Sequence, residues 1–332
     1  MRDHGGNIDW AIRTFGGDAT DWIDLSTGIN RVPYPVPPLS AEAWTMLPTR
    51  TSVAALIDAA RRAYGGSAAI LPVAGAQAAI QMIPRLVAPG RARVLSPTYN
   101  EHAACLRSAG WAVTEAASVA DLEGADLAVV VNPNNPDGRS FAPDRLLALA
   151  NRVGQLVVDE SFADAQPGLS LAGSAGAKGL YVLRSFGKFY GLAGVRLGFV
   201  LGHPADIAAL AGMAGPWPVS GAAIEIGRAA LADTAWAQET IARLRGEALR
   251  LDDLAGGHGW QALGGAELFR LYETPDAVAA QAHLAQHNIW SRIFPYSTRW
   301  LRLGLPGGPA EWARVVEAFG PQGGMLSPHA SL

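Results

Sequence analysis

The sequence has few of the features that mark secreted, membrane-spanning or metal-binding proteins. It contains a single cysteine, Cys105, so it can form no intramolecular disulfide and offers no set of cysteine metal ligands. No apolar run approaches the length of a membrane span, and residues 1–7 hold no apolar signal region. We therefore expect a cytoplasmic protein with no metal site and no membrane partner.

An excess of charge of either sign is also missing. Charged residues make up 17% of the 332 residues, acids and bases are interspersed, and the net charge is only −3. This balance gives no reason to expect nucleic acid as a partner, so any anion must bind at a local cluster. What the chain does have is an apolar content of 49% and enough length for about two domains with a large core.

Short apolar runs alternate with helical patterns from about residue 52 to about residue 205. Six of these runs are expected to be strands: residues 70–74, 93–96, 111–116, 127–131, 156–158 and 179–183. Apolar strands that alternate with helices are typical of a largely parallel sheet that is covered on both faces. We therefore expect an α/β domain in this part of the chain.

Four polar side chains fall at or just past the carboxyl ends of these predicted strands. They are Tyr99, Asn135, Asp159 and Lys188. Each has an ordinary structural explanation when taken alone, such as a packed aromatic ring or a helix cap. Because open α/β sheets bind ligands at this edge, their common position favours a ligand site.

The glycine-rich stretch 185–198 is the most informative part of the sequence. Lys188 follows a predicted strand, and Ser185 and Arg196 are a hydroxyl and a guanidinium suited to one phosphate group. An amine beside a phosphate-binding loop is what a pyridoxal phosphate (PLP) site requires. The alternative is a solvated lysine in a glycine-rich loop.

The remaining segments predict a second, α+β domain and an extended arm. We expect residues 1–44 to form an arm that belongs to the small domain, 45–220 a large domain, 221–319 a small domain, and 320–332 a disordered tail. A single long helix is predicted over 221–254. The arm has too few apolar residues to bury a core of its own, so it must lie on the rest of the protein or on a second subunit.

Taken together, these motifs resemble the fold-type I PLP enzymes, the aspartate aminotransferase superfamily, from about residue 22 to 319. The resemblance rests on Pro97-Thr98-Tyr99, Asn134-Asn135-Pro136, Asp159-Glu160, Ser185-Phe186-Gly187-Lys188 and Gly194-Val195-Arg196-Leu197-Gly198. It implies a large domain with a mostly parallel seven-stranded sheet in α/β/α layers, a smaller α+β domain, and PLP as cofactor. It also implies a homodimer.

The resemblance assigns roles to individual residues. Lys188 would bind PLP covalently, Asp159 would contact the pyridine nitrogen, and Tyr99 would lie against the ring as the third catalytic residue. Asn135 would bond the phenolic oxygen. The cofactor's phosphate would be held by Gly75, Ala76, Gln77, Ser185 and Arg196.

Two families within the superfamily are similar to the chain: the threonine-phosphate decarboxylases and the histidinol-phosphate aminotransferases. The amino-terminal His4-Gly5-Gly6-Asn7 resembles the former, and Phe162 stands where aminotransferases carry a tyrosine. The implied substrate is a small phosphorylated amino acid, decarboxylated after its carboxylate and phosphate are bound by His4, Asn30, Arg292 and Arg302. An aminotransferase remains the alternative, because paired arginines would also suit its substrate.

Overall fold

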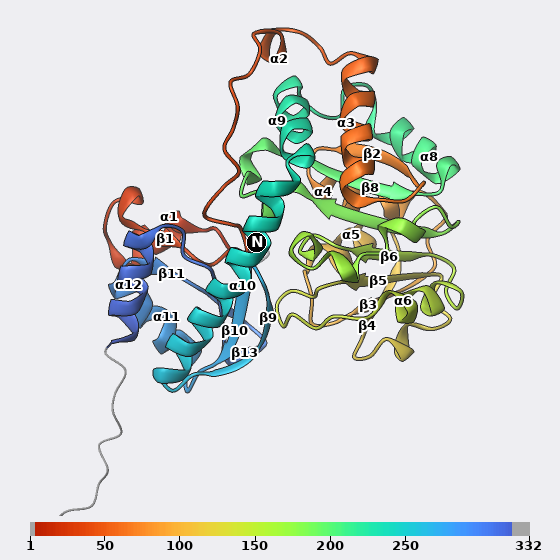
Figure 1. Ribbon diagram of the computed structural model, residues 1–332. Helices are drawn as coiled ribbons and strands as arrows, with labels where there is room; N and C mark the ends of the chain where they lie inside the picture. The colour runs from red at the N-terminus through yellow and green to blue at the C-terminus, as the bar shows by residue number, and fades with distance from the viewer. Residues whose placement is uncertain (1–3, 321–332) are drawn as a thin grey trace, which may run out of the picture. The chain divides into compact units, whose positions relative to one another are not determined.

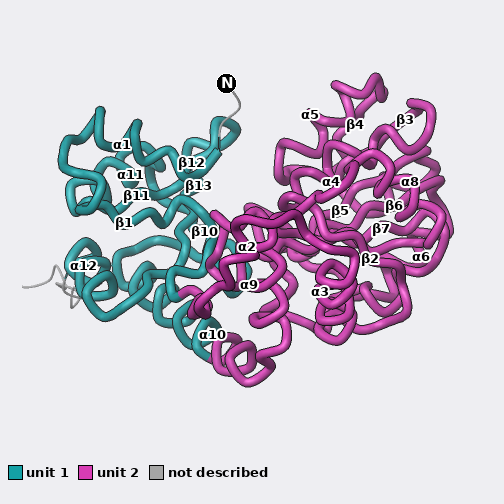
Figure 2. The backbone as a smooth tube through the Cα atoms, turned by 90° about the horizontal axis from the view of Figure 1, so that it is seen from above, with its two compact units in different colours: residues 1–32, 243–332 teal, residues 33–242 magenta. Residues whose placement is uncertain are grey.

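The computed structural model describes residues 4–320, which form two compact units. Unit 1 combines the chain up to Val32 with the chain from Arg243 onward, and unit 2 is the continuous stretch Pro33–Ala242 (Figure 2). The long helix α10 (Thr234–Gly257) begins in unit 2 and ends in unit 1.

Unit 2 is built on a seven-stranded sheet (Figure 1). In spatial order its strands are β2 (Ala69–Val73), β8 (Gly198–Gly202), β7 (Leu180–Ser185), β6 (Leu156–Asp159), β5 (Leu127–Val131), β3 (Arg91–Leu95) and β4 (Ala112–Ala116). The strands from β7 to β4 are parallel, and β8 is antiparallel to both of its neighbours. Every residue of β5 and β6 is buried, as expected for strands covered on both faces. The predicted mostly parallel sheet is confirmed.

Helices cover both faces of this sheet. On one face, α4 (Ala76–Met82), α5 (Glu101–Ser108) and α8 (Pro204–Ala214) share an apolar cluster with Val157 and Leu183. On the other face lies α3 (Arg50–Tyr64), whose Tyr64 ring contacts Phe199 of β8 at a centroid distance of 5.6 Å. The remaining helices of unit 2 are α2 (Glu42–Thr45), α6 (Pro143–Ala150), α7 (Phe186–Phe189) and α9 (Gly221–Ala232).

Unit 1 has the predicted α+β composition. Its antiparallel sheet contains, in order, β12 (Arg292–Phe294), β13 (Ser297–Gly304), β10 (Phe269–Glu273) and β9 (Gln261–Ala266). A separate pair joins β1 (Ile23–Asp24) in parallel to β11 (Ile289–Trp290). The helices are α1 (Ile8–Phe15), α11 (Ala277–Gln286) and α12 (Pro309–Phe319), besides the second part of α10.

The amino-terminal segment packs closely on the last strand of unit 1. The backbone N–H of Gly304 donates to the carbonyl oxygen of Leu25 at 2.7 Å. A Cβ atom at residue 304 would lie 2.4 Å from the carbonyl oxygen of Thr27, so only glycine allows this approach.

The single helix predicted over 221–254 is wrong, because the chain forms α9 and α10 with a break at Asp233. The backbone of Asp233 leaves the helical conformation, and its carboxylate accepts a hydrogen bond from the N–H of Trp236 at 3.0 Å. The side chain therefore caps the start of α10, which a continuous apolar pattern does not reveal.

The units divide at 32/33 and 242/243, whereas the sequence analysis placed the domain boundaries at 44/45 and 220/221. Residues 33–44 belong to unit 2. The N–H of Tyr34 donates to the carbonyl of Tyr190 at 2.9 Å, and the N–H and the hydroxyl of Ser40 donate to the carboxylate of Glu225 in α9. Helix α9 itself packs against α3. Of the predicted tail, only Gly320 lies within the described residues.

Candidate active site

The polar residues predicted to share one edge of the sheet do so. Tyr99 follows β3, Asn135 follows β5, Asp159 ends β6, and Ser185 ends β7, three residues before Lys188 in α7. They line one cavity of about 150 Å³, here called the sheet-edge cavity. Its lining includes all nine residues that the sequence assigned to the cofactor: Gly75, Ala76, Gln77, Tyr99, Asn135, Asp159, Ser185, Lys188 and Arg196. The structure brings these residues together, and their individual roles stay predictions.

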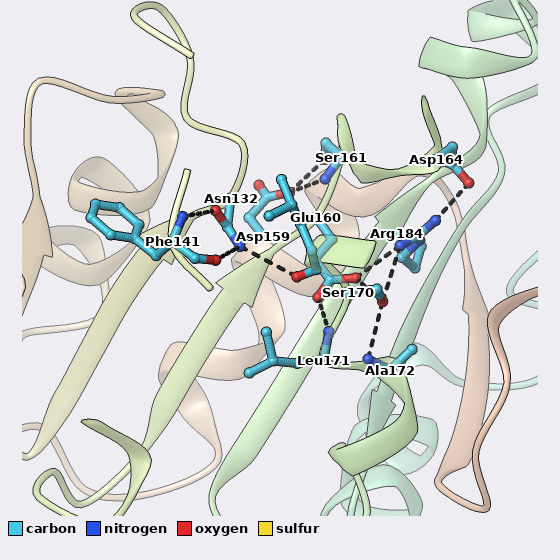
Figure 3. Close-up of polar contacts among 11 residues, drawn as sticks. Asn132, Phe141, Asp159, Glu160, Ser161, Asp164, Ser170, Leu171, Ala172 and Arg184 are labelled. Atoms are coloured by element: carbon cyan, nitrogen blue, oxygen red, sulfur yellow. Dashed lines mark hydrogen bonds and ion pairs between the residues drawn. The ribbon is translucent and has the colours of Figure 1, made fainter. Parts of the chain in front are cut away.

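Asp159 is held in its ionised form by two neighbours. Its Oδ2 atom lies 2.8 Å from Nε2 of His102. Its Oδ1 atom accepts bonds from the N–H and the hydroxyl of Ser161 at 2.9 and 2.5 Å (Figure 3). Burial alone would raise the pKa of the Asp159 carboxyl, but the hydrogen bond and charge of His102, with the bonds from Ser161, outweigh it and lower the pKa. A buried carboxylate of this kind can hold a positive charge in the cavity.

His102 is a site residue that the sequence analysis missed. It lies in the first turn of α5, three residues after Tyr99, and its ring packs edge-on against the Tyr99 ring at a centroid distance of 6.1 Å. The short spacing across the start of α5 was the available signal, since the N–H of His102 donates to the carbonyl oxygen of Tyr99 at 3.4 Å within one turn of the chain.

Tyr99 and Gln77 bond to each other across the cavity lining. The hydroxyl of Tyr99 donates to Oε1 of Gln77 at 3.2 Å, and Nε2 of Gln77 lies 3.4 Å from a carboxylate oxygen of Glu101. Burial, with help from the charge of Glu101, raises the pKa of Tyr99 to about 12, so its phenol is neutral at physiological pH. The ring of Tyr99 is therefore a fixed, uncharged wall.

Arg196 lies against the turn that starts α4. Its backbone is left-handed, with φ 55°, and a Cβ atom on Gly75 would lie 2.6 Å from its Nη2 atom. The guanidinium thus occupies the space that a side chain at residue 75 would need. Together with the hydroxyl of Ser185 and the backbone at the start of α4, this arrangement suits a phosphate group.

Lys188 is half-buried in the same cavity. Its Nζ atom lies 5.8 Å from the centroid of the buried Phe162 ring. Close backbone packing fixes the turn that carries it, since a Cβ atom on Gly187 would lie 2.7 Å from Cα of Ala193. Lys178 is the only other lysine in the sequence, and it precedes β7 at the opposite end of that strand.

The four predicted substrate residues lie in unit 1. His4 and Arg292 line a cavity of about 480 Å³, here called the unit 1 cavity. Arg302 is directly opposite Arg292 in the ladder between β12 and β13, and its guanidinium donates to the carbonyl of Ser26. Burial and the charge of Arg292 lower the pKa of Arg302 to about 9, which leaves it positive at neutral pH. Two adjacent cations of this kind favour binding of an anion.

Asn30 has a different environment from the other three. It is buried, and it is not part of the lining of the unit 1 cavity. Its Oδ1 atom accepts bonds from Nη2 of Arg243 at 2.8 Å and from the N–H of Val32 at 3.0 Å. Arg243 is 213 residues from Asn30 in the chain, so no local pattern predicts this contact.

Comparison with known proteins identifies the family. The family model described as aminotransferase class I and II matches residues 23–319. The chain belongs to the class I and II aminotransferase family. Enzymes of this family use PLP, and the residues of the sheet-edge cavity fit that cofactor: an amine, a carboxylate for the ring nitrogen, an aromatic wall and a phosphate-binding end.

Individual relatives extend the match over nearly the whole chain. The chain is 44% identical over 326 residues to the threonine-phosphate decarboxylase of Pseudomonas aeruginosa, covering 96% of this chain and 97% of that protein. A threonine-phosphate decarboxylase from Sinorhizobium sp. is 43% identical, with 95% and 97% covered. Among solved structures, the histidinol-phosphate aminotransferase of Sinorhizobium meliloti in complex with pyridoxal-5'-phosphate has a TM-score of 0.78 at 20% identity, covering 96% of this chain and 94% of the other. This likeness shows the shared fold.

Within residues 4–320, no helix is long and apolar enough to cross a membrane. Nor do the described residues include a group of three or more histidine, cysteine, aspartate or glutamate side chains that could hold a metal ion.

Proposed function

We propose that this protein is a PLP-dependent threonine-phosphate decarboxylase, which converts L-threonine O-3-phosphate to (R)-1-aminopropan-2-yl phosphate in cobalamin biosynthesis. The observation that carries the proposal is the 44% identity to the Pseudomonas aeruginosa threonine-phosphate decarboxylase over 96% of the chain. The lining of the sheet-edge cavity supports it, because every residue type that PLP requires is present there.

The residues of the sheet-edge cavity divide into those that hold the cofactor and those that act. Arg196, Ser185 and the turn at Gly75 would bind its phosphate, and Asp159 would keep its ring nitrogen protonated. PLP, when bound, withdraws electrons from the substrate's Cα. Tyr99 would restrict the ring to one plane, which matters because the bond that breaks must lie perpendicular to that plane.

Decarboxylation requires one bond to break and one to form at Cα. The bond from Cα to the carboxylate breaks and CO₂ leaves. The electron pair of that bond stays on the substrate and forms a new bond to a proton delivered to Cα. We assign this proton to the amine of Lys188, which the turn after β7 holds in the cavity.

The arginine pair of unit 1 would bind the substrate's two anionic groups. Arg292 and Arg302 are neighbours across a strand ladder, and guanidinium suits both carboxylate and phosphate. His4 shares the unit 1 cavity with Arg292 and would add a further contact to the phosphate. Asn30 would take part with its amide group, whose oxygen is already bonded to Arg243.

A second copy of the chain is the proposed partner, in a cytoplasmic homodimer. Three apolar side chains within residues 44–47, near the start of unit 2, are largely exposed: Trp44 (70%), Met46 (60%) and Leu47 (63%). Exposed apolar groups of this size mark interaction surfaces in soluble proteins.

The deciding experiment offers L-threonine O-3-phosphate and histidinol phosphate in parallel, each with and without 2-oxoglutarate. CO₂ released from threonine phosphate without the acceptor is the expected result. Glutamate formed from histidinol phosphate, with no CO₂ from threonine phosphate, would establish the aminotransferase alternative instead.

A further inference from the structure

A buried ion cluster lies behind the sheet-edge cavity, on the opposite face of the same two strands. Arg184 of β7 is 4% exposed, and its guanidinium donates to Glu160 at 2.8 Å and to Asp164 at 2.7 Å (Figure 3). Glu160 is fully buried, and its other oxygen accepts the N–H of Leu171 at 2.6 Å. The hydroxyl of Ser170 donates to Glu160 at 2.6 Å. Both terminal nitrogens of Arg184 are therefore paired with carboxylates, while its buried Nε atom has no hydrogen-bond partner among the described residues.

The position of this cluster follows from the alternation of side chains along a strand. Val157 and Leu183 belong to the apolar cluster under α4 and α5, so Asp159 and Ser185, two residues further along each strand, face the same side. Arg184 lies between Leu183 and Ser185, and Glu160 comes directly after Asp159, so both alternate with these residues and face the side of α3. There the Arg184 guanidinium lies 4.5 Å from the Tyr64 ring centroid.

Backbone pairing confirms that the ladder continues to these residues. Asp159 is the partner of Leu183, and the N–H of Glu160 donates to the carbonyl of Leu183 at 2.9 Å. The Glu160–Arg184 bond thus joins β6 and β7 at the last step before the chains diverge. Glu160 directly follows Asp159 in the chain, and Arg184 directly precedes Ser185, so each partner of the bond is adjacent to a residue of the cavity.

Burial and charge attraction act in opposite directions on Arg184. One guanidinium serves two carboxylates in the interior. Burial opposes the charge on Arg184, but Asp164 and Glu160 overcome it and raise the pKa of Arg184 above its ordinary value. Removal of a partner from a buried pair leaves an uncompensated charge, so the geometry of these strand ends depends on all three groups.

We propose that Arg184 and Glu160 are positioning residues that fix the spacing between Asp159 and Ser185, and hence between the contacts to the cofactor's ring nitrogen and its phosphate. This inference rests on the proposed function, since it concerns residues assigned to PLP. Both ends of a rigid cofactor must be bound at once, so a small change in this spacing weakens both contacts.

The test compares Glu160→Gln and Arg184→Lys with wild type as purified holoprotein. The readouts are the dissociation constant for PLP, the pH midpoint of the bound cofactor's visible absorbance, and the thermal midpoint with and without PLP. We expect PLP to bind at least about tenfold more weakly and the absorbance midpoint to move, because misplaced contacts act on the cofactor directly.

Asp252→Asn is the matched control, because it removes an ion pair with Arg270, at 2.7 and 2.9 Å, far from the cavity residues in sequence and within unit 1. It should lower the thermal midpoint and leave the affinity for PLP and the absorbance midpoint unchanged. If Arg184→Lys fails to fold, Ser170→Ala removes one bond to Glu160 and should give a smaller change in the same direction.

The outcomes separate this inference from the proposed function. Variants that lose thermal stability but keep the wild-type affinity for PLP and the wild-type absorbance midpoint would reduce the cluster to a structural cross-link and overturn the inference alone. Wild-type protein that binds no PLP would overturn the proposed function and the inference together.

Discussion

Nε2 of His102 lies 2.8 Å from Oδ2 of Asp159, and both side chains are buried. The pKa of Asp159 is lowered below its unfolded value of 3.8, although its burial acts in the opposite direction. The stabilisation that the carboxylate gains is therefore complete above that value and is lost as the pH falls through the lower, folded-state pKa.

We predict that His102→Leu lowers the free energy of unfolding by about 3 kcal/mol at neutral pH, since it leaves a buried carboxylate without its main partner. Burial then raises the pKa of Asp159 in the variant, so the deficit should shrink as the pH approaches 4 and the carboxyl is protonated. Urea unfolding at a series of pH values measures this. Ser161→Ala, which keeps His102, should show a smaller loss, and a deficit for His102→Leu that does not vary with pH would contradict the explanation.

Lys188 and Lys178 allow a clean test of the covalent attachment. Borohydride treatment of the protein with PLP should label Lys188 in wild type and in Lys178→Arg, which leaves the amine of the cavity intact. Lys188→Ala should lose turnover yet still bind PLP non-covalently, because the phosphate and ring contacts remain. Peptide mass spectrometry locates the label. Near-wild-type turnover in Lys188→Ala would show that this amine has no catalytic role.

Tyr99 separates the contribution of a ring from that of a hydroxyl. Tyr99→Phe keeps the ring and loses the bond to Gln77, so affinity for PLP should fall by less than about tenfold, as expected from a net 0.5–1.5 kcal/mol per hydrogen bond. Tyr99→Leu, which removes the ring, should weaken binding more. Equilibrium dialysis measures both. The pKa of Tyr99 is about 12, so its phenol stays neutral up to about pH 11, roughly one unit below that pKa. Wild type and Tyr99→Phe should therefore share the same pH profile of activity below about pH 11.

The lowered pKa of Arg302 predicts how anion binding depends on pH. An analogue that carries a carboxylate and a phosphate but no amino group should bind with constant affinity to about pH 8 and more weakly above about pH 9, as Arg302 loses its proton. Since burial is the larger cause and Arg292 the second, Arg292→Gln should move this midpoint to higher pH.

The same variant should also lose affinity, by about 1.5–3 kcal/mol, if Arg292 contacts the phosphate. Isothermal titration over the pH range gives both quantities. Unchanged affinity would remove Arg292 from the site, and an unmoved midpoint would mean that the two arginines do not interact.

The exposed side chains of Trp44 and Leu47 predict the dimer interface. Trp44→Ser combined with Leu47→Ser should weaken dimerisation at least about tenfold, since burial of such groups contributes about 1.5–3 kcal/mol each. Leu249→Ser is the control, because Leu249 is 62% exposed and lies in α10. Analytical ultracentrifugation decides the matter, with circular dichroism to verify folding. A wild-type monomer at micromolar concentration would contradict the homodimer itself.

The cavity residues could be predicted from sequence because parallel strands bring their carboxyl ends to one edge. Tyr99, Asn135 and Asp159 needed only a correct assignment of β3, β5 and β6. Strand β8 was not foreseen, since Gly198 follows a glycine-rich turn and the strand runs against its neighbours, outside the alternating strand–helix pattern.

Contacts between distant segments could not be predicted from the sequence. The bond from Arg243 to Asn30 spans 213 residues, and no local pattern marks either partner. Glu160 and Arg184 were also missed as a pair, although each is adjacent to an assigned residue. Their pairing depends on which strands are neighbours and in what register, and only the assembled sheet defines both.

The discontinuity of unit 1 has a consequence for how the chain folds as the ribosome makes it. Unit 2, residues 33–242, is continuous and complete before any residue of β11 has been synthesised. Strand β1 is made first, and its partner among the described strands is β11, so β1 must wait for most of the chain to be translated before it can pair. Because domains tend to fold as units during synthesis, unit 2 is expected to fold first, and the earliest residues made would be among the last to reach their final places.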